Sequence, residues 1–139
     1  MKTKPISFRP SKGLDSRLEA MRRRTGIPKS RLAEQLIDEA ERMRRYPGIA
    51  FNGPDHDRGA WVIGTHLDIW EVILGWQDFG EDAQRVQDYF QISPRQLNLA
   101  LAYYREFKDE IDHALALQRR PLSELEKEYP FAQVVRIEE

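Results

Sequence analysis

The spacing of apolar positions near the start of the chain changes at about residue 11. Ile6 and Phe8 alternate with polar neighbours, which is the period of a short strand with one apolar face. The next apolar positions recur every three or four residues, at Leu14, Leu18 and Met21. This spacing predicts an amphipathic helix that Ser11 caps and Gly26 ends.

A second helix is predicted to begin around residues 28–30 and to end at Tyr46-Pro47-Gly48. Its apolar side carries Leu32, Ala33, Leu36, Ile37, Ala40 and Met43. Residues 1–46 thus form a first domain with the order strand, helix, helix. Because this lone strand has no partner nearby, we expect it to pair with the same strand of a second copy. A two-stranded antiparallel ribbon of this kind fits the major groove of DNA.

The charges are divided unevenly between the two halves of the chain. Residues 1–50 contain 13 Lys and Arg against 6 Asp and Glu, whereas the remaining residues contain 9 against 17. This asymmetry favours a polyanionic partner for the basic half and a protein partner for the acidic half. Two simpler interpretations remain open: the charges only solvate the surface, or the basic half is a helical hairpin that packs on the rest of the chain.

The N-terminal domain resembles the ribbon-helix-helix family of bacterial repressors and antitoxins, of the CopG-like type. The residues that carry the resemblance are Ile6-Ser7-Phe8-Arg9 and Gly26-Ile27-Pro28-Lys29-Ser30 followed by Leu32. It covers roughly residues 3–46. The resemblance implies base contacts from Thr3, Pro5, Ser7 and Arg9. It also implies a phosphate contact from the backbone near Lys29 and Ser30, at the start of the second helix.

A junction rich in Pro and Gly occupies residues 47–60 and leads into a second domain over residues 49–118. Residues 49–51 and 60–63 are short apolar segments that predict a β-hairpin. Three or four helices follow, of which one has a capping box formed by Ser93 and Gln96. Residues 81–90 and 94–104 have the spacing of a helix-turn-helix. We favour a structural or protein-binding role for it over a second DNA reader using Arg95, Gln96, Asn98 and Arg105, because the surrounding domain is acidic.

Residues 49–117 resemble a small antitoxin-associated domain of unknown function. The matching segments are the turn Gly64-Thr65 leading into a helix, and Ala100-Leu-Ala-Tyr-Tyr before the acidic segment Glu110-Ile-Asp. The resemblance implies a VapB-like partner of a PIN-type ribonuclease toxin. In the tail, residues 119–139, the apolar side chains Leu122, Leu125, Tyr129 and Phe131 are candidates for binding that toxin. Alternatively, the tail only completes the domain.

No enzymatic chemistry is expected. The chain has no cysteine, its three histidines form no pair with metal-ligand spacing, and it has no glycine-rich phosphate loop, so we expect no catalytic residue, no metal site and no cofactor. The first dozen residues lack the apolar core of a signal peptide, and no apolar run approaches membrane-spanning length. These features, with the absence of cysteine, lead us to expect a cytoplasmic protein without a membrane partner.

The expected fold class is mainly α with short β. The expected function is that of an antitoxin in a type II toxin-antitoxin pair. It would bind its own operator in double-stranded DNA as a homodimer or higher even oligomer, repress its own transcription and neutralise the toxin. The alternatives are a free-standing transcriptional regulator and a protein-interaction module.

Overall fold

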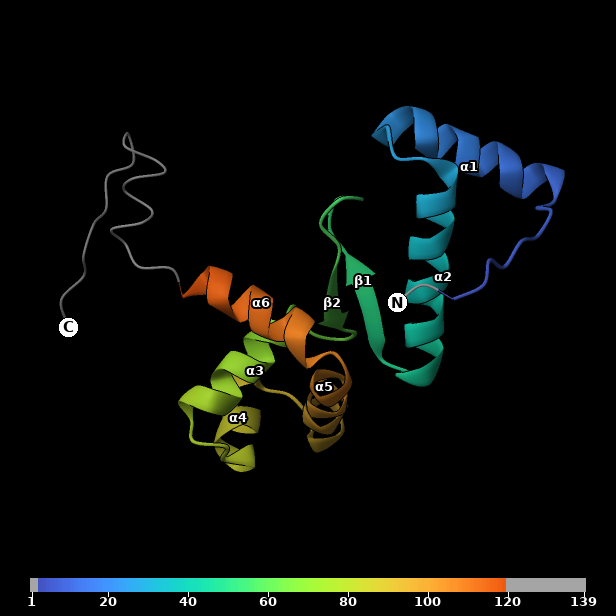
Figure 1. The fold of residues 1–139 in the computed structure, drawn as a ribbon. Helices are drawn as coiled ribbons and strands as arrows, with labels where there is room; N and C mark the ends of the chain where they lie inside the picture. The colour runs from blue at the N-terminus through green and yellow to red at the C-terminus, as the bar shows by residue number, and fades with distance from the viewer. Residues whose placement is uncertain (1–2, 120–139) are drawn as a thin grey trace, which may run out of the picture. The chain divides into compact units, whose positions relative to one another are not determined.

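The computed structural model describes residues 3–119 and is mainly helical with one two-stranded sheet (Figure 1). This confirms the predicted class of mainly α with short β. The chain divides into two compact units, unit 1 at residues 1–59 and unit 2 at residues 60–139. Each unit is described separately below.

Unit 1 contains two helices, α1 (Lys12–Thr25) and α2 (Lys29–Arg45), at the predicted positions. The Ser11 hydroxyl accepts a hydrogen bond from the Leu14 N–H at 3.2 Å and caps α1. Gly26 has φ of 75° and its N–H donates to the Arg22 carbonyl at 2.8 Å, a left-handed ending that favours glycine. Local sequence therefore fixes both ends of α1.

The two helices of unit 1 pack through a small apolar contact and a charged one. Leu18 and Leu32 are buried. Lys29 Nζ lies 3.1 Å from a carboxylate oxygen of Asp15 and 3.2 Å from one of Glu19, so it joins the start of α2 to α1.

The strands β1 (Ile49–Asn52) and β2 (Gly59–Val62) form the predicted hairpin. Its loop requires glycine at position 53, because φ is 104° and a Cβ there would lie 2.5 Å from the Asp57 carbonyl oxygen. Arg58 donates to the carbonyls of Gly53 at 2.9 Å and Phe51 at 3.2 Å, and pairs with Glu39 of α2 at 2.8 Å. The hairpin loop is thereby fastened to α2.

Unit 2 contains four helices in its described part: α3 (Ile69–Asp78), α4 (Ala83–Phe90), α5 (Pro94–Glu106) and α6 (Lys108–Gln118). Helix α3 contacts each of the other three and forms the centre of the unit. The core of unit 2 contains Ala60, Val62, Ile69, Val72, Ile73, Val86, Ile92, Leu97, Ala100, Tyr103, Ile111 and Leu115.

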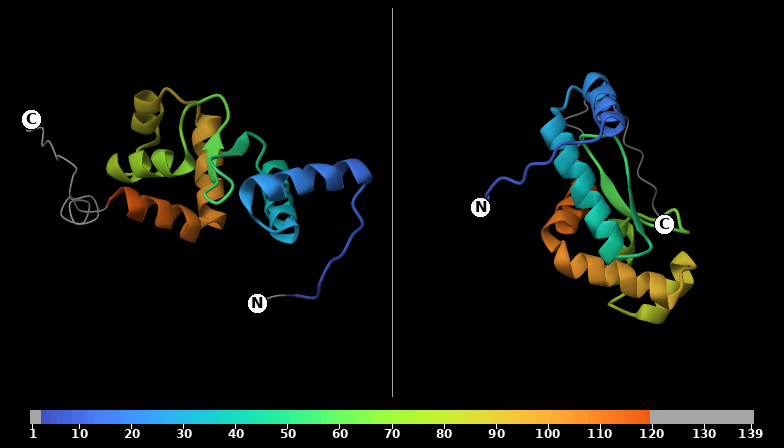
Figure 2. Two further views of the ribbon diagram at one scale, coloured as in Figure 1. Left: turned by 90° about the horizontal axis from the view of Figure 1, so that it is seen from above. Right: turned by 90° about the vertical axis from the view of Figure 1, so that its right-hand side faces the viewer.

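The predicted capping box at the start of α5 is confirmed. The Gln96 N–H donates to the Ser93 hydroxyl at 3.1 Å, and the Ser93 N–H donates to the Gln96 side chain at 2.9 Å. Gln91, between α4 and α5, adopts a left-handed conformation with φ of 56°. Helix α5 ends at Glu106, and Phe107 links it to α6; the two views of Figure 2 show the short connections within this unit.

Candidate nucleic-acid interface

The N-terminal segment, residues 3–10, belongs to no helix or strand in this single chain. Its predicted base-reading residues are all exposed: Thr3, Pro5, Ser7 and Arg9. The apolar residues that alternate with them are exposed as well, Ile6 by 94% and Phe8 by 57%. In one chain, both the polar side of the segment and the apolar side formed by Ile6 and Phe8 are therefore exposed to solvent.

A second exposed apolar surface lies on α2. Leu36, Ile37 and Met43 are exposed by 42%, 59% and 41%, and Ala40 is also exposed. Their spacing of one, four and seven residues places them along one side of the helix. We call these four residues the α2 stripe.

The cations of unit 1 fall into two groups. Residues 3–59 hold 13 Lys and Arg against 8 Asp and Glu, an excess of five positive charges. Six of the cations form ion pairs with carboxylates of the same unit: Arg22, Arg23, Lys29, Arg42, Arg45 and Arg58. The remaining seven have no ion pair among the described residues: Lys4, Arg9, Lys12, Arg17, Arg24, Arg31 and Arg44. These seven are available to an anionic partner.

Lys29 illustrates the difference between the two groups. The hydrogen bonds that Lys29 donates to Asp15 and Glu19 raise the pKa of Lys29, and the hydrogen bonds that Glu19 accepts from Arg22 and Lys29 lower the pKa of Glu19 to about 2. The Lys29 side chain is thus engaged between the helices. Its backbone N–H and that of Ser30 have no acceptor among the described residues, because the first helical bonds run from Arg31 and Leu32 to the Pro28 carbonyl. The predicted phosphate contact at this helix start was a backbone contact, and these two N–H groups are available for it.

Sequence reasoning missed the ion pairs that hold unit 1 together. The Glu19 and Arg22 pair has a helical spacing of three residues, which is a readable signal. The Lys29 and Asp15 pair spans 14 residues, and the Arg58 and Glu39 pair spans 19. No local pattern in the sequence indicates these two.

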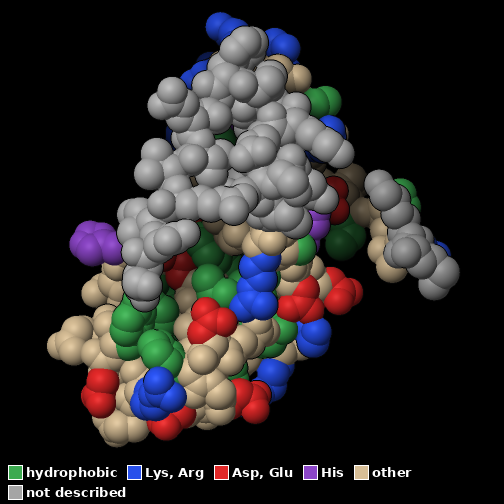
Figure 3. Space-filling model, turned by 90° about the vertical axis from the view of Figure 1, so that its left-hand side faces the viewer, with side chains coloured by type: hydrophobic (Ala, Val, Ile, Leu, Met, Phe, Trp, Pro, Cys, Tyr) green, Lys and Arg blue, Asp and Glu red, His purple; other side chains and the backbone are tan. Residues whose placement is uncertain are grey.

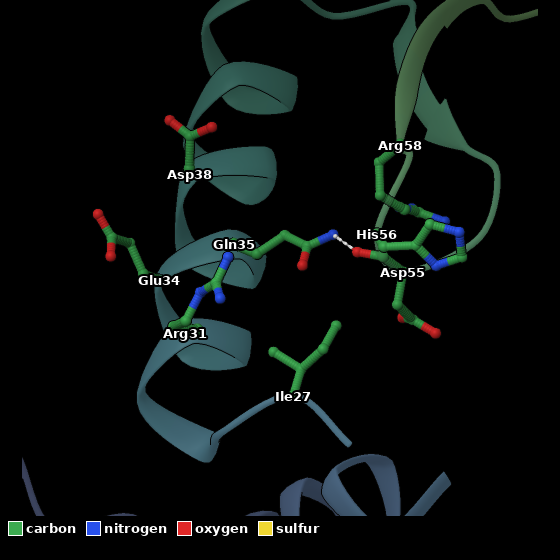
Figure 4. A pocket seen from close by; sticks show the side chains of 8 residues that line it. All are labelled: Ile27, Arg31, Glu34, Gln35, Asp38, Asp55, His56 and Arg58. Atoms are coloured by element: carbon green, nitrogen blue, oxygen red, sulfur yellow. Dashed lines mark hydrogen bonds between the residues drawn. The ribbon is translucent and has the colours of Figure 1, made fainter. Parts of the chain in front are cut away.

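An open depression of about 700 Å³ lies between α2 and the hairpin loop of unit 1 (Figure 4). It is lined by Ile27, Arg31, Glu34, Gln35, Asp38, Asp55, His56 and Arg58. The Gln35 side chain points across it and donates to the Asp55 carbonyl at 3.1 Å. Its charges are mixed, and its Arg58 already serves the hairpin, where Glu39 raises the pKa of this arginine. The depression therefore does not extend the basic surface.

Unit 2 differs in charge. Residues 60–119 hold 10 Asp and Glu against 5 Lys and Arg, and on the face drawn in Figure 3 the two signs are interspersed. The predicted toxin-binding residues Leu122, Leu125, Tyr129 and Phe131 lie outside the described residues. Within residues 3–119, no group of three or more His, Asp and Glu side chains is placed to hold a metal ion. No helix in this range has the length and apolar character needed to cross a bilayer.

Comparisons of the chain with models of known protein families, with curated proteins and with solved structures find no match.

Proposed function

We propose that the protein is a homodimeric DNA-binding repressor in which the N-terminal segments of two chains pair as an antiparallel ribbon and enter the major groove. The observation that carries the proposal is the exposure of Ile6 and Phe8 on a segment that belongs to no helix or strand in one chain. Pairing with a second copy turns both side chains inward and leaves Ser7 and Arg9 facing outward. The same pairing satisfies the backbone N–H and C=O groups of the segment.

Two further features of unit 1 support this function. The α2 stripe offers a second apolar surface to a partner copy, which is the self-complementary arrangement that a two-fold dimer needs. The unpaired cations Lys4, Arg9 and Lys12 lie on or next to the segment, where they attract phosphates. The free N–H groups of Lys29 and Ser30 add a phosphate contact.

The proposal includes the antitoxin role. In it, unit 1 binds the operator, while unit 2 and the tail bind a PIN-type ribonuclease and block it. This part rests on the resemblance of residues 49–117 and on the acidic character of unit 2. It is tested by expressing the product of the adjacent gene alone and together with this chain. The role requires that the product stops growth by cleaving RNA and that this chain relieves the arrest. If the product of the adjacent gene did not stop growth, the antitoxin role would fail and only the proposed repressor function would remain.

The DNA-binding function is tested by titrating the full chain onto the DNA upstream of its own gene, beside a scrambled duplex of equal length, at several salt concentrations. We expect preferential binding to the natural duplex that weakens steeply with salt. Equal or absent binding would overturn the proposal.

Arg9→Ala is the informative variant, because arginine reads guanine through two hydrogen bonds worth about 1–3 kcal/mol. We expect its preference for the natural duplex to fall roughly tenfold or more in the same titration. Arg44→Ala is the matched control, since Arg44 is another unpaired cation at the far end of α2. It should leave the preference unchanged. If Arg9→Ala kept full preference, Arg9 would not be a base reader.

A further inference from the structure

Helices α4 and α5 of unit 2 are joined by the three residues 91–93, which is the connection length of a helix-turn-helix. The eight-residue α4 is followed by Gln91 in a left-handed conformation and by Ser93, which caps α5. Val86, Ile92 and Leu97 are buried and fix the two helices in the unit. In such a motif the outward side of the second helix is the surface that enters a DNA groove.

The outward side of α5 carries Arg95, Asn98 and Arg105, which are all exposed. Their spacing of three and seven residues places them along one side of the helix, with the half-buried Ala102 between them. The only acidic residue of α5 is its last, Glu106. We call Arg95, Asn98 and Arg105 the α5 face.

The two arginines of the α5 face differ from the other cations of unit 2. Within residues 60–119, Arg85 lies over the Phe79 ring at 4.8 Å, Lys108 pairs with Asp112, and Arg119 pairs with Asp78 at 3.4 Å. Arg95 and Arg105 have no ion pair and no side-chain hydrogen bond with any described residue. Arg95 also lies in the first turn of α5, where the helix dipole disfavours a cation. Its position therefore does not serve the stability of the unit.

We infer that the α5 face is a second surface for double-stranded DNA, which binds the same DNA molecule as the N-terminal ribbon. Guanidinium groups and an amide are donors that match phosphate oxygens and base edges in the major groove. The inference rests on the proposed function, because that function brings DNA to the chain.

Most acidic residues of unit 2 lie on elements other than α5. Nine of the ten acidic residues in 60–119 lie outside α5, on α3, α4, α6 and the connections before α3 and α4. Two of the nine contact α5: Glu110 and Asp112 of α6 accept hydrogen bonds from the hydroxyls of Tyr103 and Tyr104. At physiological salt the interaction between exposed charges is screened beyond about 8 Å, so acidic residues beyond this distance contribute little to the potential at the α5 face.

The test compares two charge-matched double variants of the full chain on the natural duplex over a range of salt concentrations. The double variant Arg95→Gln with Arg105→Gln removes the two cations of the α5 face, which have no ion pair among the described residues. The control variant Arg85→Gln with Arg119→Gln removes one cation that lies over the Phe79 ring and one that pairs with Asp78. If each arginine of the α5 face neutralises one phosphate, a dimer loses four contacts, and the slope of log K against log salt becomes shallower by about 3.6. We expect the first variant to lose at least tenfold in affinity and the control to keep the wild-type slope.

The outcomes separate the inference from the proposed function. If the wild-type chain shows no preference for the natural duplex, both fail. If it prefers that duplex and Arg9→Ala reduces the preference, while the α5 variant keeps the wild-type affinity and slope, only the inference fails. Equal losses in both double variants would also overturn it, because they would report net charge alone. All three tryptophans lie in unit 2, so an unchanged near-ultraviolet circular dichroism spectrum shows that unit 2 is folded in each double variant.

Discussion

The two units of the chain bury very different amounts of apolar surface. In its described part, unit 1 buries three apolar residues, Leu18, Leu32 and Ile49, whereas the described part of unit 2 buries twelve. The exposed residues show the opposite distribution: among residues 3–119, five of the eight large exposed hydrophobic residues belong to unit 1, namely Ile6, Phe8, Leu36, Ile37 and Met43. A unit of fewer than 60 residues with so small a core needs help from outside its own chain to be stable.

Under the proposed function, this difference assigns stability to unit 2 and assembly to unit 1. Unit 2 completes its core with its own helices. Unit 1 has apolar positions that are regular in sequence and left uncovered in one copy. We therefore expect substitutions at exposed apolar sites of unit 1 to act on assembly, and substitutions at buried sites of unit 2 to act on folding.

The largest effect is expected from Ile6→Lys combined with Phe8→Lys. In the proposed ribbon a dimer buries four of these side chains, each contributing about 1.5–3 kcal/mol. Their loss, with four charges placed in the interface, should weaken dimerisation by at least about 1,000-fold and abolish operator binding. Analytical ultracentrifugation measures the first effect and the duplex titration measures the second.

Ile63→Lys is the control for this double variant, because Ile63 is exposed by 48% but lies in unit 2. It should leave the dimer intact. A double variant that remained dimeric at wild-type concentrations would show that the N-terminal segments do not form the interface.

The second effect is the loss of stability of unit 2 in Leu97→Ala. Leu97 is only 1% exposed, and replacing a buried leucine with alanine costs about 2–5 kcal/mol. Urea unfolding followed by tryptophan fluorescence should show a lower midpoint, while the oligomeric state stays unchanged below the transition. Leu117→Ala on α6 is the matched control, because Leu117 is 53% exposed and its loss should change stability by less than about 0.5 kcal/mol. Equal costs at the two sites would contradict the burial pattern.

The sequence predicted those elements whose signals are local. The Ser11 and Ser93 caps, the left-handed Gly26 and the hairpin strands all follow from residues within a few positions of one another. The class of mainly α with short β follows from the same periodicities. The sequence predicted three or four helices after the hairpin, and the described part of unit 2 has four, because α5 and α6 are separate helices joined at Phe107.

The candidate site was less predictable, because its features depend on distant residues. Four of the six paired cations of unit 1 pair at helical spacings of three or four residues, which a sequence can indicate, whereas Lys29 with Asp15 and Arg58 with Glu39 are pairs between residues far apart in the chain. For Arg95 and Arg105 of the α5 face, the net negative charge of the whole domain led the sequence analysis to favour a structural or protein-binding role over DNA binding. Only the arrangement of partners separates these two arginines from the engaged cations of unit 2.

A smaller effect is expected within the core of unit 2 from Gly75→Ala. Alanine favours a helix over glycine by about 0.5–1 kcal/mol, but a Cβ here would lie 2.4 Å from Phe90 Cε2. Overpacking of this kind costs about 1–3 kcal/mol, so we expect a net destabilisation of about 1 kcal/mol by urea unfolding. Adding Phe90→Leu should restore part of the loss, because the shorter side chain makes room for the new methyl group. A Gly75→Ala variant more stable than wild type would show that Phe90 moves aside freely.

The smallest effect is expected from Glu19→Gln in unit 1, which removes the carboxylate that Arg22 and Lys29 share. The pKa of Glu19 is lowered from 4.5 to about 2, so its charged form stabilises the fold. The benefit is complete above about pH 4.5 and disappears as the pH falls toward 2. Thermal unfolding should therefore show a lower Tm for the variant at neutral pH, and the difference in Tm between variant and wild type should narrow as the pH falls from about 4.5 toward 2.

The same difference in Tm should also shrink near 1 M salt, where the screening length is about 3 Å, because these side chains are exposed to solvent. A difference that persisted unchanged at low pH and high salt would mean that Glu19 acts through packing, and the link between α1 and α2 would then be apolar rather than ionic.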